Sequence, residues 1–374
     1  MAEQENLHKK KQRQRKRNFA AQSSGFKHRF VAWLLNRLGL IETRRKAKVA
    51  AGDQNWRIIR YLRIARPVEQ PYPLLPTSYV SPEVFEKHMV YLVKHCHPLS
   101  LDALVTSLEA GQPVPERAVV TVFDEGWRDS FHFAFPILKN LRIPATIFLP
   151  TAFIGTMNLF WRDKIIASML LLEQGGVKFP PLPTIEQVIG ESVGGEAAFD
   201  LGYSMARIIH LLEYLETASV AERELVLMTL GMGVEGLGGI PTDRLFLSWE
   251  EVLTMKNDGI QFGSNGHTHS LLSELTSEGI GNDLDESLRR LQEHGINTVP
   301  VFSFPEGRIS REARSLLYER GLRYGLAEGS YSRGVKGKSI TNILGCTTMF
   351  ESVSYNVDMF ACRLWGVGGF GESY

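Results

Sequence analysis

The spacing of apolar and polar positions changes along the chain from about residue 56 onward. Short apolar runs of strand length occur at residues 58–61, 118–123, 145–149, 260–263 and 301–304. Helical spacing appears between them. Residues 82–95, for example, follow a Ser-Pro start signal and carry apolar residues on one helical face. Strands that alternate with helices in this way form parallel sheets, so the pattern predicts an α/β fold.

The middle of the chain departs from this alternation. Prolines at 180, 181 and 183 and glycines near 190–195 and 231–239 punctuate two helical patterns. The clearer pattern runs through Met205, Ile208, Leu212 and Leu215. We therefore expect a helical insertion at about residues 156–246, which either packs against the rest of the fold or lies over an active site.

The first fifty residues have a different character. Residues 1–17 hold seven Lys and Arg, leaving 35 of the 42 basic residues for the rest of a chain whose net charge is +1. We expect residues 1–24 to be a basic disordered tail and residues 25–50 an amphipathic helical segment with Phe30, Leu34 and Leu38 on its apolar face. This helix either packs on its own domain or contacts an anionic membrane surface; no specific nucleic acid partner is expected.

Three cysteines, Cys96, Cys346 and Cys362, lie far apart without paired spacing. This spacing indicates neither a disulfide framework nor a cysteine zinc site. No apolar run approaches the roughly 20 residues that span a bilayer, and the N-terminus lacks the apolar core of a secretory signal. We expect a cytoplasmic protein, with membrane association through the N-terminal segment left open.

Candidate chemistry appears first where the run 118–123 ends. Asp124 and Glu125 follow it directly, ahead of Gly126. Enzymes with parallel strands place catalytic groups at these carboxyl ends. One carboxylate can bind a metal while its neighbour acts as a base on metal-bound water. Asp-Glu-Gly is also ordinary turn chemistry, so this pair alone leaves both interpretations open.

A second group of polar residues follows the run 260–263. Asn265, His267 and His269 occur here within five positions, and neutral imidazole is a preferred ligand of zinc. A helix-capping or core role is the alternative for either histidine. Trp127, Trp161 and Trp249 occur near the same predicted strand ends, where each can line a ligand site or belong to the core.

Together these segments closely resemble the polysaccharide deacetylase, or NodB-homology, family of carbohydrate esterases. The resemblance covers roughly residues 56–340 without the insertion. Its segments, in family order, are Ser81 to Phe85, Phe123 to Asp129, Phe135 to Lys139, Ile143 to Leu149, Phe160 to Asp163, Leu247 to Val252, Gly263 to His269 and Phe302 to Arg308.

The resemblance implies a fold, a reaction and roles for the residues. The fold would be a distorted, incomplete (β/α) barrel of about seven strands within residues 51–374, and the reaction the removal of N-acetyl groups from an acetylated sugar or polysaccharide. A divalent metal, typically Zn²⁺, would activate water. Asp124 matches the base and Arg308 lies close enough to stabilise it, while Glu306 would present a backbone N–H. The implied metal ligands are Glu125, Asn265, His267 and His269, and the sugar would contact Trp127, Trp161 and Trp249.

Several positions depart from the family pattern. Glu125 replaces an aspartate, Asn265 replaces a metal-binding histidine, and Leu62 stands where related sequences carry a proton-donating histidine. A neutral amide is a poor substitute for imidazole, and no general acid is obvious. Three functions therefore stay open: a deacetylase with an altered metal shell, a catalytically impaired glycan-binding or scaffold protein, and a hydrolase of another non-peptide C–N bond.

Overall fold

A computed structural model describes residues 29–75, 77–176, 205–235, 237, 243–329, 332–333 and 342–367. The predicted tail at residues 1–24 lies outside these residues, as does the part of the predicted insertion at 177–204.

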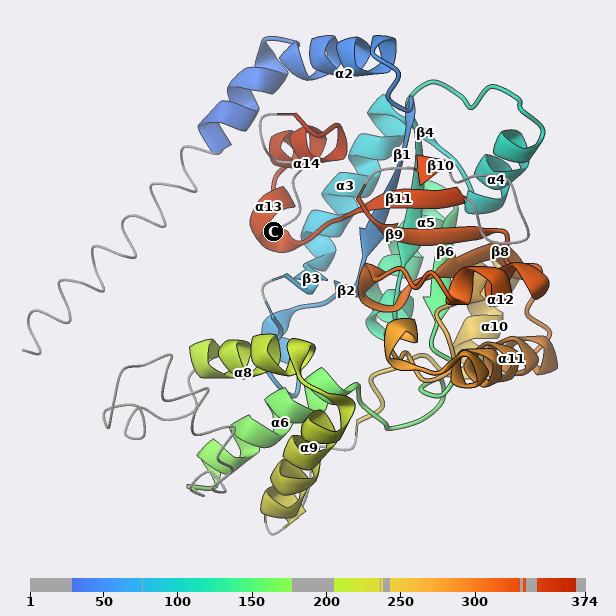
Figure 1. Cartoon of the computed structure of the whole chain (residues 1–374). Helices are drawn as coiled ribbons and strands as arrows, with labels where there is room; N and C mark the ends of the chain where they lie inside the picture. The colour runs from blue at the N-terminus through green and yellow to red at the C-terminus, as the bar shows by residue number, and fades with distance from the viewer. Residues whose placement is uncertain are drawn as a thin grey trace, which may run out of the picture.

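Seven parallel strands form a closed barrel at the centre of the molecule (Figure 1). The ring of pairings runs β1-β11-β9-β8-β7-β6-β5 and closes from β5 back to β1. This confirms the predicted α/β barrel of about seven strands. The strands are β1 (Trp56–Tyr61), β5 (Ala118–Phe123), β6 (Ala145–Leu149), β7 (Gln261–Ser264), β8 (Thr298–Ser303), β9 (Tyr324–Glu328) and β11 (Asn342–Thr348).

The closure of the barrel is uneven. Strand β1 pairs with β5 along its whole length, but it pairs with β11 only at Ile59↔Thr347 and Arg60↔Thr348. Short β4 (His97–Pro98) adds to β5, β10 (Ser332–Arg333) adds antiparallel to β11, and β2 (Arg63–Ile64) pairs separately with β3 (Tyr79–Val80). The seam between β1 and β11 is therefore short, like that between β7 and β8, which also pair at two positions only.

Burial on both faces explains why the sequences of the strands are continuous apolar runs. All six residues of β5 and all five of β6 are buried, because their outer faces are covered and their inner faces fill the barrel. Six helices surround the ring: α3 (Pro82–His95), α4 (Leu101–Glu109), α5 (Phe135–Leu141), α10 (Trp249–Asn257), α11 (Ser277–Glu293) and α12 (Ala313–Glu319).

Three further helices lie together at one end of the barrel (Figure 1). They are α6 (Trp161–Gln174), α8 (Met205–Thr217) and α9 (Val220–Glu235). Their shared apolar cluster includes Ile165, Leu212 and Leu230, and it extends to Trp127 and Phe246 next to the strand ends. The helices of the predicted insertion are thus packed against the carboxyl ends of the barrel strands.

At the N-terminus, residues 29–37 are helical and Gly39 separates them from α2 (Leu40–Ala50). Gly39 has φ 67°, a left-handed conformation that glycine adopts without strain. Ala32 is fully buried, and Asn36 donates a hydrogen bond of 2.6 Å to Asp358 of α14 (Val357–Leu364). One face of this helix therefore packs on the C-terminal helices, which also include α13 (Glu351–Ser354).

The start of α10 fixes the turn that follows Asp124 and Glu125. Ser248 and Glu251 form a reciprocal capping box, and Glu251 also accepts hydrogen bonds from Arg128 at 2.9 Å and Arg244 at 2.8 Å. Burial by itself would raise the pKa of Glu251, but the hydrogen bonds from Arg244, the Ser248 backbone and Arg128 outweigh it and lower the pKa to about 2.

We predict that Glu251→Gln lowers the free energy of unfolding at pH 7 by about 1–3 kcal/mol, because two arginines lose a charged acceptor. Since the folded pKa is depressed, this stabilisation is present above about pH 4.5 and is lost as the pH falls towards 2. Urea unfolding of both proteins across this range measures the difference. The matched control is Glu250→Gln, an exposed position on the same helix; equal effects of the two changes would contradict the prediction.

Candidate functional site

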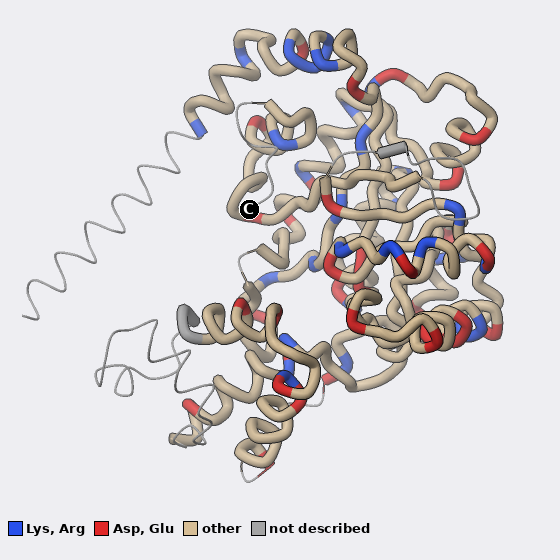
Figure 2. Tube along the Cα trace, in the orientation of Figure 1, with Lys and Arg blue, Asp and Glu red and all other residues tan. Residues whose placement is uncertain are grey.

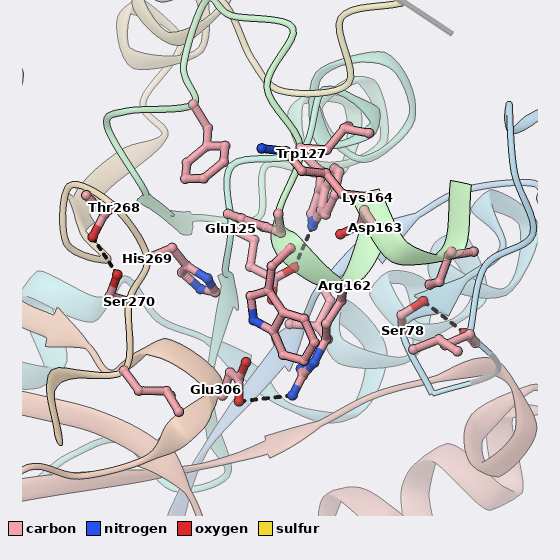
Figure 3. A pocket seen from close by; sticks show the side chains of 18 of the residues that line it. Ser78, Glu125, Trp127, Arg162, Asp163, Lys164, Thr268, His269, Ser270 and Glu306 are labelled. Atoms are coloured by element: carbon pink, nitrogen blue, oxygen red, sulfur yellow. Dashed lines mark hydrogen bonds and ion pairs between the residues drawn. The ribbon is translucent and has the colours of Figure 1, made fainter. Parts of the chain in front are cut away.

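A pocket with a volume of about 460 Å³ lies between the carboxyl ends of the strands and helices α6 and α9 (Figure 3). Its chemistry comes from strand-end loops and from the first turn of α6. Figure 3 shows Glu125, His269 and Glu306 directed into the same space as Arg162. The polar and aromatic side chains that line it include Glu125, Trp127, Trp161, Arg162, Asp163, His269 and Glu306.

Asp124 follows β5 and is 4% exposed, and it does not line the pocket. Its Oδ2 atom accepts a hydrogen bond of 3.1 Å from Arg60, whose guanidinium also donates to Glu328 at 2.9 Å and to Thr348 at 2.8 Å. The other oxygen, Oδ1, is buried without a hydrogen-bond partner. A buried arginine therefore neutralises this carboxylate and leaves one acceptor unused.

Glu125 faces the pocket beside Asp124. Its Oε2 atom accepts a 2.6 Å hydrogen bond from the indole N–H of Trp127. Burial raises the pKa of Glu125 to about 7, and the charge of Asp124 adds to the rise, while the Trp127 hydrogen bond opposes it. At neutral pH this carboxyl is thus divided between its protonated and charged forms.

Asn265 and His267 are committed to other partners. The Asn265 side-chain oxygen accepts the backbone N–H of Glu125 at 3.3 Å, and its nitrogen donates to the carbonyl of Ser303 at 2.8 Å. These two contacts fix the orientation of the amide. If its oxygen and nitrogen were exchanged, two donors would meet at Glu125 and two acceptors would meet at Ser303. His267 Nδ1 lies 2.9 Å from the Thr151 hydroxyl, and His267 is not among the residues that line the pocket.

His269 is the one predicted histidine that reaches the pocket. Its ring stacks on Phe160, with centroids 4.4 Å apart. Burial lowers the pKa of His269 to about 4, although the charges of Glu306 and Asp124 act in the opposite direction. The imidazole is therefore neutral at physiological pH and can act as a hydrogen-bond donor or acceptor.

Backbone strain is concentrated at this pocket. Glu125, His269 and Glu306 have φ values of 73°, 57° and 54°, in the left-handed region that non-glycine residues seldom adopt. In the described residues, the other non-glycine positions with positive φ are Arg117 and Arg142. Strained residues often cluster where a site has to hold side chains in place. The positive φ values therefore occur in the same loops that supply the polar side chains of the pocket.

The described residues do not fit the zinc site that the family resemblance implies. Zinc needs three or four converging N, O or S donors, and no group of three His, Cys, Asp or Glu suited to a metal occurs in the described part of the chain. The side-chain oxygen of Asn265 accepts the Glu125 backbone N–H, and its side-chain nitrogen donates to the Ser303 carbonyl. Glu125 is bound to Trp127, and Asp124 already has a cationic partner in Arg60.

The remaining predicted residues are divided between the pocket and its surroundings. Trp161 and Glu306 line the pocket, and Glu306 pairs with Arg162 at 3.0 Å. Trp249 lies outside the pocket lining and stacks on His294 at 3.9 Å. The expectation that Arg308 stabilises Asp124 is corrected: the turn at Pro305–Gly307 leaves the Arg308 side chain 46% exposed, 3.3 Å from Glu216.

Four residues of the site were not expected from sequence. Arg60 holds Asp124, and Arg162 holds Glu306. Tyr72 donates a 3.0 Å hydrogen bond to Asp163, where burial raises the pKa to about 6. Arg60 was recognisable in principle as a charge inside a buried strand, which needs a buried partner. The contacts of Arg162, Tyr72 and Asp163 depend on how α6 lies over the carboxyl ends of the barrel strands.

The family model described as polysaccharide deacetylase matches residues 198–325. Asp124 and Glu125 precede the matched segment, whereas Asn265, His269 and Glu306 lie within it. A search of curated protein sequences found no match.

The chain is similar to solved structures of deacetylases at low sequence identity. Deacetylase PplD of Streptococcus pyogenes, solved in complex with acetate, has a TM-score of 0.47 and 13% identity over 80% of this chain and 93% of its own. IcaB of Ammonifex degensii has a TM-score of 0.49 and 14% identity over 83% and 97%. The BpsB deacetylase domain of Bordetella bronchiseptica has a TM-score of 0.42 and 16% identity over 79% and 97%. The chain is thus similar to the polysaccharide deacetylase family over residues 198–325, which include β7 and β8 of the barrel.

Proposed function

We propose that the pocket binds an N-acetylated sugar and that this chain is a glycan-binding member of its family. The observation that carries the proposal is the composition of the pocket, which combines a partly exposed indole, Trp161, with the polar groups of Arg162, Asp163 and Glu306. Sugar rings stack their apolar faces on aromatic rings, and their hydroxyl and amide groups pair with charged side chains. The neighbouring carboxyls of Glu125 and Asp163 add both donors and acceptors near neutral pH.

N-deacetylation of the bound glycan is the second candidate. It is favoured by Asp124, whose free Oδ1 atom can accept a proton from water while Arg60 holds Oδ2. Glu125, with its pKa of about 7, can supply a proton to a leaving amine. The described residues provide no metal ligand set that would polarise the acetamide carbonyl, so binding is the better supported role. Nothing in this pocket distinguishes an N-acetyl group from another amide.

We further propose that this function is exercised in the cytoplasm, with peripheral contact to a membrane. The three cysteines are described as free thiols, which suits a reducing compartment. No described helix is long and apolar enough to cross a bilayer. The N-terminal helices also expose an apolar and basic surface. Cell fractionation that recovers the protein outside the cell would overturn this location.

Replacement of Trp161 tests the binding role. We expect Trp161→Ala to weaken binding of an acetylated chito-oligosaccharide by about tenfold, since loss of one ring contact costs about 1–2 kcal/mol. Isothermal titration calorimetry measures the affinity. Trp33→Ala is the matched control, because Trp33 is exposed and lies far from the pocket in the N-terminal helix. Unchanged affinity in Trp161→Ala would rule out this pocket as the sugar site.

Metal content and acetate release separate the two candidate functions. We expect no stoichiometric zinc after dialysis against excess zinc, and no acetate released from acetylated chito-oligosaccharides. Elemental analysis and an acetate assay, with Asp124→Ala as the comparison, measure both. Stoichiometric zinc together with acetate release that disappears in Asp124→Ala would instead establish a deacetylase.

The raised pKa of Glu125 predicts a pH-dependent loss of stability. The folded state holds the Glu125 proton more tightly than the unfolded state. The contribution of this proton to the free energy of unfolding is therefore fully present below about pH 4.5 and is lost as the pH rises through 7. Relative to Glu125→Gln, the free energy of unfolding of the wild type should fall by at most about 3 kcal/mol across this pH range. Urea unfolding at several pH values tests this, and parallel curves for the two proteins would show that folding does not raise the pKa of Glu125.

A further inference from the structure

We propose that the N-terminal helical segment, residues 29–40, is a docking surface for a membrane that carries anionic lipids. The surface consists of large apolar side chains that remain open to solvent although Ala32 and Leu35 of the same helix pack on the domain. Its members, exposed by 38% to 60%, are Phe30, Val31, Trp33, Leu34, Leu38 and Leu40. This inference is independent of the proposed sugar-binding function.

The helix at residues 29–37 has two apolar faces, and the fold uses one of them. Ala32 and Leu35 belong to the core and Asn36 bonds to α14, so these residues attach the helix to the domain. Phe30, Trp33 and Leu34 follow the three-to-four-residue spacing of the opposite face. The rings of Phe30 and Trp33 lie 5.8 Å apart and form one continuous patch. Packing on the domain thus does not account for the exposed face.

Charge identifies the partner. Figure 2 shows Lys and Arg positions along the same two helices, and Arg29, Arg37, Arg44 and Lys46 are all exposed. The sequence places seven further Lys and Arg in residues 1–17. Aromatic and aliphatic side chains bordered by basic residues suit the interface of an anionic bilayer, where the apolar groups enter the acyl boundary and the cations meet lipid headgroups.

Other occupants match this surface less well. A second copy of the chain would bring basic residues against basic residues, which is repulsive. Residues 1–28 contain four large apolar side chains, Met1, Leu7, Phe19 and Phe26, against twelve Lys, Arg, His and Glu, so they match the patch less well than a bilayer does. A nucleic acid would satisfy the cations but would leave Phe30, Trp33 and Leu34 in water.

Docking in this way would keep the pocket accessible. Helix α2 precedes β1 and lies at the amino-terminal end of that strand, whereas the pocket is at the carboxyl ends next to α6 and α9 (Figure 1). A membrane bound at the N-terminal segment would therefore lie at the opposite end of the barrel from the mouth.

Vesicle flotation with the full chain tests the proposal. We expect the protein to float with vesicles of phosphatidylcholine and phosphatidylglycerol, to bind phosphatidylcholine alone at least about tenfold more weakly, and to dissociate as salt screens the charges. The triple variant Phe30→Ser, Trp33→Ser, Leu34→Ser should reduce binding to the anionic vesicles by at least about tenfold. Arg37→Glu combined with Arg44→Glu should reduce it as well, without removing an apolar group.

The control removes equally exposed apolar residues elsewhere. Leu225, Met228 and Met232 of α9 are exposed by 45% to 59%, and changing all three to serine should leave vesicle binding unchanged. Circular dichroism checks that each variant is folded. The proposal is overturned if the wild type does not bind anionic vesicles or if the α9 variant loses binding equally. It is also overturned if the N-terminal variant instead abolishes a dimer, seen by light scattering, or the binding of RNA.

Discussion

The buried guanidinium of Arg60 holds the mouth of the barrel together. It lies on β1 next to the short β1–β11 seam and contacts groups at the ends of three other strands: Asp124 after β5, Glu328 of β9 and Thr348 of β11. Removing one partner of a buried ion pair typically costs about 3–5 kcal/mol, because the other charge stays desolvated. Closure of the barrel and the state of Asp124 therefore depend on the same side chain.

This arrangement also changes what the mouth can do chemically. A divalent cation would approach two carboxylates, Asp124 and Glu328, that already share a permanent positive charge. Asn265 supports the same conclusion, since its amide bridges the Glu125 backbone and Ser303 and so ties the ends of β5, β7 and β8 together. Both Arg60 and Asn265 act as structural links between strand ends, and Asn265 does so at a position where the family resemblance implies a metal ligand.

The pocket owes its other half to the insertion. Trp127 is 3% exposed and stacks on Phe246 at 4.4 Å, so most of its ring is used for packing, while its N–H holds Glu125. Trp161, Arg162 and Asp163 come from the first turn of α6, which the shared apolar cluster seats over the mouth. The loops at the ends of the barrel strands thus supply Glu125, His269 and Glu306 to the pocket. The packing of α6 supplies Trp161 and the carboxyl of Asp163.

The sequence by itself determined five of the seven barrel strands and their order, whereas β9 and β11 were not expected. The alternation of apolar runs and helical spacing, the Ser-Pro start of residues 82–95, and the family segments are local patterns, because each depends on neighbouring residues. Tertiary structure alone decided the partners of the site residues. Arg60 rather than Arg308 donates a hydrogen bond to Asp124. His294 stacks on Trp249, and the Ser303 carbonyl accepts a hydrogen bond from Asn265. These contacts join residues far apart in the chain, and their formation depends on which strand ends and loops the closed barrel brings within hydrogen-bonding distance.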